Sequence, residues 1–340
     1  MSTAQTSLWG GETGGDLHSE IERQGFTLIE HAIPSDEIDA YVAAYAEFTD
    51  NLPDPEPATL NAMMRDASNL DRLDFSKDTQ IDWHKYRSNI PHFAKPNGYT
   101  NRSYQADVLR QFDRKVKNKE TGELEYIVED PKEYFHYTPV TTNSRGEDPV
   151  STRVLLGQRH EHYGWGPLPP ELIKLNNHMH SLHYLAKKAV SRFLYDLEAT
   201  HPQLPHIITP EDLNISSIRG LFYHTGQGDT LAAGHNDRGA ATLQIAESHL
   251  GLRVRNPQTH EMDLVERDPV HGVAFPAQKW KGVDPHTTLR SLWHDVINVN
   301  TACEDRHLHG RDIARWAIIF FVNSIHLGEE VDKSLTHTET

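Results

Sequence analysis

The second half of the chain has the hydrophobic pattern of a β-rich protein. Between residues 218 and 252, short runs of apolar, β-branched and aromatic residues alternate with glycine-rich turns. This pattern predicts antiparallel strands joined by turns. Residues 291 to 299 again consist largely of residue types that favour extended structure, so they predict a further strand.

Residues with the apolar spacing of helices precede this region. Apolar residues recur at helical intervals between residues 38 and 48, and Ser35 stands where a capping residue is expected. Residues 171 to 200 predict a long helix. Residues 51 to 170 form an irregular, proline- and aspartate-rich region, in which residues 119 to 123 predict a hairpin turn. Helices followed by many strands predict an α+β fold with a mainly β core, namely a double-stranded β-helix (jelly roll) with N-terminal and flanking helices.

Two histidines and one aspartate stand out against this background. His235 and Asp237 lie two residues apart in the predicted strand region, and alternate residues of a strand face the same side. His294 lies in the predicted strand of residues 291 to 299. With 23 histidines and 49 acidic residues, a His-x-Asp tripeptide alone is weak support for a metal site. His294 strengthens it, because a second imidazole in a strand completes the two histidines and one carboxylate that form the facial triad of non-haem Fe(II) oxygenases.

Further segments of the chain resemble those of a known family and occur in the same order as in that family. Residues 23 to 34 include Gly25-Phe26 and end in a turn-like His-Ala-Ile-Pro, residues 97 to 99 read Asn-Gly-Tyr, and residues 130 to 135 read Asp-Pro-Lys-Glu-Tyr-Phe. Residues 315 to 323 form an apolar run that begins with an arginine. The chain resembles the isopenicillin N synthase-like family of Fe(II)/2-oxoglutarate-dependent oxygenases over residues 20 to 325.

The resemblance implies a role for each of five residues. His235, Asp237 and His294 would be the catalytic metal ligands for Fe(II), with 2-oxoglutarate and O2 as co-substrates. Arg315 would bind the distal carboxylate of 2-oxoglutarate through its planar guanidinium, and Tyr223 would donate its hydroxyl to the same carboxylate. The implied enzyme is a dioxygenase that oxidises a small-molecule metabolite, with hydroxylation the expected outcome and desaturation, epoxidation or ring closure as others, in specialised metabolism.

Two departures from the family pattern leave alternatives open. Ala317 replaces the serine of the family's Arg-x-Ser, and 21 residues separate His294 from Arg315, so residues 301 to 314 form an insertion. His307 in that insertion is a rival for the distal metal ligand, although its surroundings are polar and loop-like. An oxidase of the same fold that does not use 2-oxoglutarate is an alternative function. A non-catalytic β-helix protein that binds a small ligand is a third.

Composition narrows the class of protein. A formal charge of minus 16 opposes nucleic-acid and membrane-surface binding. We expect a cytoplasmic protein, because no apolar run is long enough to span a membrane and the N-terminus lacks the pattern of a signal peptide. The single cysteine, Cys303, cannot form an internal disulfide. The expected domain order is a flexible tail (residues 1 to 19), one domain (20 to 325, with the helical and irregular part at 20 to 200 and most of the jelly roll at 201 to 325) and a polar tail (326 to 340).

Overall fold

The structure is a computed structural model that describes residues 17–51, 93–94, 97–101, 116–117, 124–125, 132–139, 152–162, 166–204, 208–225, 228–283, 287–299 and 305–324. The helices are α1 (Leu17–Gln24), α2 (Ser35–Asp50), α6 (Thr152–His162), α7 (Pro170–Glu198), α9 (Asp212–Ile215) and α10 (Trp280–Val283). The strands are β1 (Thr27–Glu30), β2 (Phe93–Ala94), β3 (Asn97–Asn101), β4 (Val116–Lys117), β5 (Leu124–Glu125), β6 (Lys132–Tyr137), β7 (Ser217–His224), β8 (Thr230–His235), β9 (Ala241–Glu247), β10 (Leu252–Arg255), β11 (Met262–Leu264), β12 (His271–Pro276), β13 (His294–Ile297) and β14 (Ile313–Val322).

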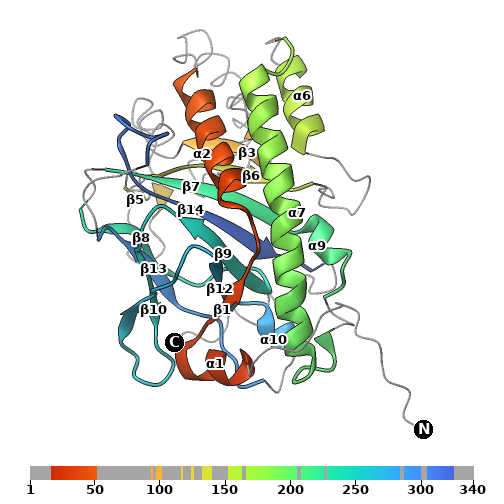
Figure 1. Ribbon diagram of the computed structural model, residues 1–340, viewed down its shortest axis with the longest axis vertical. Helices are drawn as coiled ribbons and strands as arrows, with labels where there is room; N and C mark the ends of the chain where they lie inside the picture. Colours follow the sequence, from red (N-terminus) through yellow and green to blue (C-terminus); the bar gives the residue numbers. More distant parts are fainter. Residues whose placement is uncertain are drawn as a thin grey trace.

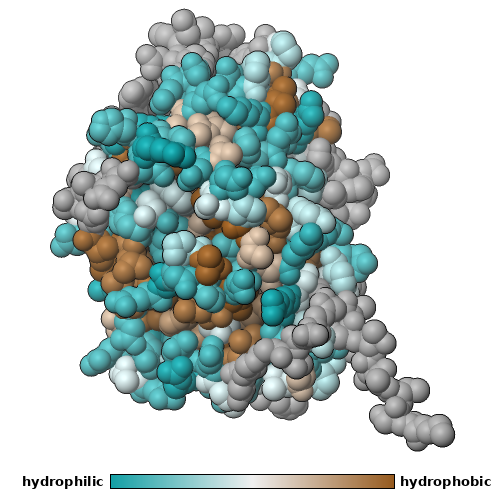
Figure 2. All heavy atoms as spheres, viewed as in Figure 1, coloured by the Kyte–Doolittle hydropathy of each residue, from teal (hydrophilic) through white to brown (hydrophobic). Residues whose placement is uncertain are grey.

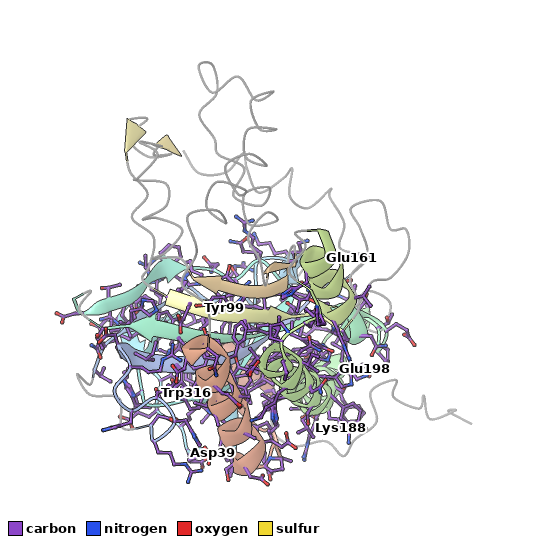
Figure 3. The ribbon with its side chains drawn as sticks, turned by 90° about the horizontal axis from the view of Figure 1, so that it is seen from above. Asp39, Tyr99, Glu161, Lys188, Glu198 and Trp316 are labelled. Atoms are coloured by element: carbon purple, nitrogen blue, oxygen red, sulfur yellow. The ribbon has the colours of Figure 1, made fainter. Side chains whose placement is uncertain are left out.

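Two antiparallel sheets form the core. The larger sheet has the order β1-β12-β9-β14-β7-β6-β3-β2, and the smaller has the order β11-β10-β13-β8. Strands distant in sequence are neighbours in both sheets, as in a jelly roll. Helices α2 and α7 lie side by side against the larger sheet (Figures 1 and 3). The predicted mainly β jelly roll with flanking helices is therefore confirmed.

Several predicted elements can be compared with the observed ones. The hairpin turn predicted at residues 119 to 123 lies outside the described residues, and the strands β4 and β5 on either side of it pair antiparallel. The long helix of residues 171 to 200 corresponds to α7. Residues 17 to 19 were predicted to belong to the N-terminal tail, but they form the start of α1. The remainder of that tail, Cys303 and the predicted C-terminal tail lie outside the described residues.

Two local predictions were wrong. Ser35 does not cap α2; it is the first helical residue, and Pro34 occupies the cap position without a side-chain hydrogen bond. The strand expected over residues 291 to 299 is shorter, since β13 begins only at His294. Before His294, the amide of Leu292 donates to the Pro276 carbonyl, so this segment follows an irregular path rather than a strand ladder.

Alternate residues of β14 serve the two faces of the larger sheet. Trp316, Ile318 and Phe320 belong to the hydrophobic core that includes residues of α2 and α7. The residues that alternate with them include Arg315 and Ala317, which pair with Tyr223 and Leu221 of β7 and share their face, turned away from the helices. We call this the inner face. On the helix side, hydrophilic residues cover most of the surface and hydrophobic ones show in patches near its middle (Figure 2).

Close packing of α2 on the sheet requires a glycine in β7. The ring of Tyr45 stacks on Phe222 with centroids 3.6 Å apart and 9° between the ring planes. A Cβ atom added at Gly220 would lie 1.7 Å from the hydroxyl oxygen of Tyr41. Only glycine leaves room for this tyrosine, so the sequence of β7 fixes how closely α2 approaches.

The buried histidine of α7 gives an expected pH dependence of stability. His183 is 4% exposed and its Nε2 bonds to the Ser216 carbonyl at 2.8 Å. Burial lowers the pKa of His183 from 6.5 to about 4, although the bond to Ser216 opposes the shift. Between pH 6.5 and pH 4, the unfolded chain therefore takes up a proton that the folded chain refuses. We expect the free energy of unfolding to fall by up to roughly 3 kcal/mol as the pH drops through this window.

Urea denaturation of wild type and His183→Gln at pH 7 and pH 5 measures this effect. Glutamine keeps an amide donor for Ser216 but does not titrate in this range. The wild type should lose about 2 kcal/mol more than the variant between the two pH values. Equal losses in the two proteins would assign the pH dependence to other groups.

Candidate metal centre

The neighbouring ends of β8 and β13 bring three metal-binding side chains together. His235 is the last residue of β8, His294 is the first of β13, and the two are directly paired across the smaller sheet. Asp237 follows His235 by two residues. One potential ligand atom from each residue lies within 4.8 Å of the others, and the two imidazole centroids are 4.4 Å apart. The structure thus places the three residues proposed from sequence in one group.

Backbone hydrogen bonds prepare both imidazoles for metal binding. The Nδ1 of His235 lies 2.8 Å from the Ala233 carbonyl oxygen, and the Nδ1 of His294 lies 3.2 Å from that of Leu292. A carbonyl can only accept, so each Nδ1 carries a proton, and in the neutral imidazole this leaves the lone pair on Nε2 for a metal. The two Nε2 atoms face Asp237, at 3.7 Å from Oδ1 for His235 and 3.9 Å from Oδ2 for His294. Two neutral imidazoles and one carboxylate suit a divalent transition metal such as Fe(II).

The three ligands differ in their exposure to solvent. The side chain of His235 is 46% exposed, whereas those of Asp237 and His294 are 11% and 7% exposed. Burial lowers the pKa of His294, and the nearby His235 lowers it further, while Asp237 opposes both. A lowered pKa keeps this imidazole neutral, which is the form that binds metals. The centre is therefore buried on one side and open on the other.

Neighbouring polar residues hold the segment between the ligands. The side-chain amide of Asn236 donates to both the carbonyl and the hydroxyl oxygen of Ser291, each at 3.0 Å. The backbone amide of Gln278 donates to the Asp237 carbonyl at 2.8 Å. Asn236 points away from its two neighbours, as the two-residue period of a strand predicts. These bonds tie the end of β8 to the segment that leads into β13.

Thr242 orients the carboxylate, and it was not anticipated from the sequence. Its hydroxyl donates to Asp237 Oδ2 at 2.7 Å and is buried at the start of β9. Partners of this kind fix a ligand's orientation, and their loss typically costs 10- to 100-fold in metal affinity. We therefore expect Thr242→Val to weaken Fe(II) binding roughly 10- to 100-fold.

Anaerobic Fe(II) titration measures the effect, with Thr259→Val as the matched control. Thr259 is exposed in the turn between β10 and β11, where its hydroxyl accepts from the Glu261 amide. Affinity within twofold of wild type for Thr242→Val would show that this hydroxyl does not position the ligand.

Arg315 is fully buried on the inner face, and it already has a protein partner. Its Nη2 forms an ion pair with Glu247 Oε2, and its Nε donates to the His249 carbonyl at 3.2 Å. Its Nη1 is buried and has no hydrogen-bond partner among the described residues. Glu247 also accepts from Arg267 Nε at 3.0 Å. Arg315, Glu247 and Arg267 thus form a buried cluster with one net positive charge, in which Nη1 of Arg315 is left for another acceptor.

Tyr223 lies beside Arg315 in the pairing of β7 with β14. The ring centroid of Tyr223 is 5.8 Å from the Arg315 guanidinium carbon and 5.7 Å from Lys132 Nζ. Lys132 pairs with Tyr223 in the register of β6 with β7, so it shares the inner face. The two residues predicted to bind the co-substrate are therefore neighbours. Lys132 joins them, which sequence reasoning missed because only the strand pairing reveals it.

His307 does not join the metal group. Its Nε2 accepts from the neighbouring Arg306 at 3.1 Å, and Arg306 in turn pairs with Asp39 of α2. Arg311 pairs with Asp50 of α2, so the described part of the insertion packs on this helix. Among the described residues, the group of His235, Asp237 and His294 is the one set of three or more such side chains with metal-binding spacing.

A pocket of about 780 Å³ opens elsewhere, at the start of α2. Asp39 and Trp316, which line it, lie on the helix side of the larger sheet (Figure 3). Glu247 and Arg267 contribute to its wall, but none of the three metal-binding residues does. This pocket is therefore separate from the candidate centre.

Comparison with known proteins identifies the fold. No family model and no curated protein matches the chain. Among solved structures, a full-length Neurospora crassa protein in complex with alpha-KG (2-oxoglutarate) aligns with a TM-score of 0.52 at 15% identity, covering 91% of this chain and 78% of that one. A putative oxygenase from Shewanella oneidensis aligns with a TM-score of 0.51 at 15% identity, covering 94% and 91%.

This chain shares the jelly-roll fold of these two proteins. The same Neurospora crassa protein has also been solved with alpha-KG and thymine, and that structure aligns with a TM-score of 0.50 at 15% identity, covering 91% of this chain and 79% of the other. At this identity the likeness concerns the oxygenase fold alone. In the part of the chain that the structure describes, no helix is long and apolar enough to cross a membrane.

Proposed function

We propose that the chain is an Fe(II)/2-oxoglutarate-dependent dioxygenase of the isopenicillin N synthase-like family that oxidises a small-molecule metabolite. The observation that carries this proposal is the group of His235, Asp237 and His294, whose three ligand atoms leave further metal positions open. The complexes of the Neurospora crassa protein with alpha-KG and with thymine support a 2-oxo acid co-substrate and a small-molecule substrate. The proposed reaction is a hydroxylation. We place it in specialised metabolism and in the cytoplasm.

Each residue has a defined task in this proposal. His235, Asp237 and His294 would hold Fe(II), which when bound supplies the oxidising chemistry with O2 and 2-oxoglutarate. The hydrogen bonds to the carbonyls of Ala233 and Leu292 and from the hydroxyl of Thr242 would keep the ligand atoms aimed at one point. The depth of His294 within the fold limits the access of water on that side.

The charge of the Arg315 cluster supports a dicarboxylate co-substrate. Two guanidinium groups and one carboxylate leave one positive charge in a buried place, and Arg315 Nη1 still lacks an acceptor among the described residues. The distal carboxylate of 2-oxoglutarate would supply both the missing charge and the missing acceptor. Tyr223 and Lys132 beside Arg315 would complete its surroundings.

One observation favours a second candidate function, an oxidase of the same fold that does not use 2-oxoglutarate. Glu247 already occupies Nη2 of Arg315, and Ala317 offers no hydroxyl. In that case Glu247 would remain the partner of Arg315, and the chelating co-substrate would be absent.

The experiment that separates the two candidates uses 2-oxoglutarate as the probe. Addition of Fe(II) and 2-oxoglutarate to the protein without O2 should produce a weak visible charge-transfer band. When O2 is then admitted, the protein should convert 2-oxoglutarate to succinate. If Fe(II) binds but neither signal appears with 2-oxoglutarate, the oxidase becomes the better account. A protein that does not bind Fe(II) at all would contradict both.

A further inference from the structure

The pocket at the start of α2 is lined by apolar and charged side chains together. Its volume of about 780 Å³ lies in the range of pockets that hold small organic ligands. Ile33, Ile38 and Trp316 form part of its apolar wall, and Val270, which also lines it, is 55% exposed. The pocket therefore offers an apolar surface to a ligand, and its charged side chains decide which polar groups that ligand can carry.

Arg267 brings a buried cation with one open nitrogen to this pocket. Its side chain is 4% exposed, and its Nε donates to Glu247 at 3.0 Å. Its Nη1 donates to two backbone carbonyls, that of Ile245 at 2.9 Å and that of His271. Its Nη2 has no hydrogen-bond partner among the described residues, so Nη2 is the nitrogen left to donate to a ligand in the pocket.

Asp305 gives the same pocket a carboxylate without a cationic partner. Its Oδ2 accepts from the indole nitrogen of Trp316 at 3.1 Å, and its Oδ1 accepts from the His307 amide at 2.8 Å. No basic side chain in the described part of the chain forms an ion pair with it. The other acidic side chains of the pocket each have a basic partner: Asp39 has Arg306, Asp268 has His271 and Glu247 has Arg267. Asp305 is therefore the carboxylate of this wall that can receive a positive charge from a ligand.

Glu247 connects the pocket to the proposed co-substrate anchor. Its Oε1 pairs with Arg267, which lines the pocket, and its Oε2 pairs with Arg315 on the inner face. The three side chains carry one net positive charge. A carboxylate on Arg267 would offset this charge from the pocket side, and a carboxylate on Arg315 would offset it from the inner face. Because there is one such charge, each carboxylate should reduce the attraction for the other.

We propose that this pocket is an effector site that binds a free amino acid with an apolar side chain, and that the bound amino acid weakens the binding of 2-oxoglutarate. The carboxylate of the amino acid accepts from Arg267 Nη2, and its ammonium group meets Asp305. Its side chain packs against Ile38 and Val270. The effect on 2-oxoglutarate rests on the proposed function, because it requires the co-substrate at Arg315, whereas binding in the pocket does not.

Calorimetric titration of the metal-free protein tests binding. The probes are leucine and phenylalanine, each with its N-acetyl derivative, which lacks the ammonium charge, and its primary amide, which lacks the carboxylate. We expect at least one amino acid to bind roughly tenfold or more tightly than either of its derivatives. Val270→Trp should remove binding, because the larger side chain fills the pocket. Leu264→Trp is the matched control, since Leu264 is 37% exposed and does not line the pocket. Asp305→Asn should remove the preference over the N-acetyl derivative and keep the preference over the amide.

Titration with 2-oxoglutarate, in the presence of Fe(II) and without O2, tests the effect on the co-substrate. A saturating concentration of the amino acid should lower the affinity for 2-oxoglutarate roughly fivefold or more in wild type and in Leu264→Trp. In Val270→Trp the amino acid should leave this affinity unchanged.

Three results would overturn the inference: neither amino acid binds, binding persists in Val270→Trp, or a bound amino acid leaves the affinity for 2-oxoglutarate unchanged. Failure of the proposed function has a different signature, because 2-oxoglutarate then does not bind even without the amino acid. In that case, binding of the amino acid to the metal-free protein still supports the pocket as a site, and its absence still overturns it.

Discussion

Replacement of His294 by alanine is expected to abolish Fe(II) binding and 2-oxoglutarate turnover. The variant retains only two ligands, Asp237 and the half-exposed His235. It loses the buried imidazole of His294, whose lowered pKa favours the neutral form that binds metal. Loss of a partner that merely orients a ligand costs 10- to 100-fold in metal affinity, so we expect loss of a ligand itself to exceed roughly 100-fold. Fe(II) titration and succinate formation measure the two effects.

His307→Ala is the matched control for this prediction. His307 is the histidine that sequence spacing made a rival, and it lies beside Arg306 on the α2 side of the molecule. Its replacement should leave iron binding and turnover unchanged. Loss of iron binding in His307→Ala, together with its retention in His294→Ala, would contradict the proposed ligand set. Circular dichroism of both variants separates ligand loss from unfolding.

Replacement of Glu247 by alanine is expected to destabilise the fold by about 3–5 kcal/mol. The side chains of Arg315 and Arg267 are 0% and 4% exposed, and Glu247 is the carboxylate that both contact. Its removal would leave two guanidinium groups buried without their counter-charge. Urea denaturation measures the change in the free energy of unfolding.

Added 2-oxoglutarate provides a second readout for Glu247→Ala. A dicarboxylate that binds Arg315 should raise the stability of this variant more than that of wild type, because it restores the lost charge. Asp295→Ala is the control, since its partner Arg253 is 32% exposed and the loss of such a pair should cost about 1 kcal/mol or less. If the two variants lose equal stability, the buried cluster does not contribute as its geometry indicates.

The sequence was most informative where side chains repeat with a simple period. The apolar spacing of α2, the long helix of residues 171 to 200 and the apolar run that begins at Arg315 are local patterns, and α2, α7 and β14 are observed there. His235 and Asp237 share a strand end and a two-residue spacing, so their convergence could be expected. The start of β13 was predicted three residues too early, because residue propensity does not show which backbone groups pair.

The surroundings of Arg315 could not be predicted from sequence, because they depend on a bulge. Between Ile318 and Ile319 of β14 the register with β9 shifts by one residue, so Gln244 and Glu247, an odd number of residues apart, both face inward. Strict alternation would have placed Glu247 on the opposite face. The sequence predicted that Arg315 binds the co-substrate, but it did not predict that the Glu247 carboxylate also pairs with this arginine.

The route of the chain between β13 and β14 has a consequence for how this protein can vary. Arg306 and Arg311 fasten that connection to the outside of α2, while the position of Arg315 is set by its pairing with Tyr223. Lengthening or shortening the connection therefore need not displace the guanidinium, since the two are held by different contacts. The number of residues between a metal-binding histidine and this arginine is consequently a poor criterion for recognising distant homologues. The residue that pairs with the arginine across the sheet, here Tyr223, is a better one.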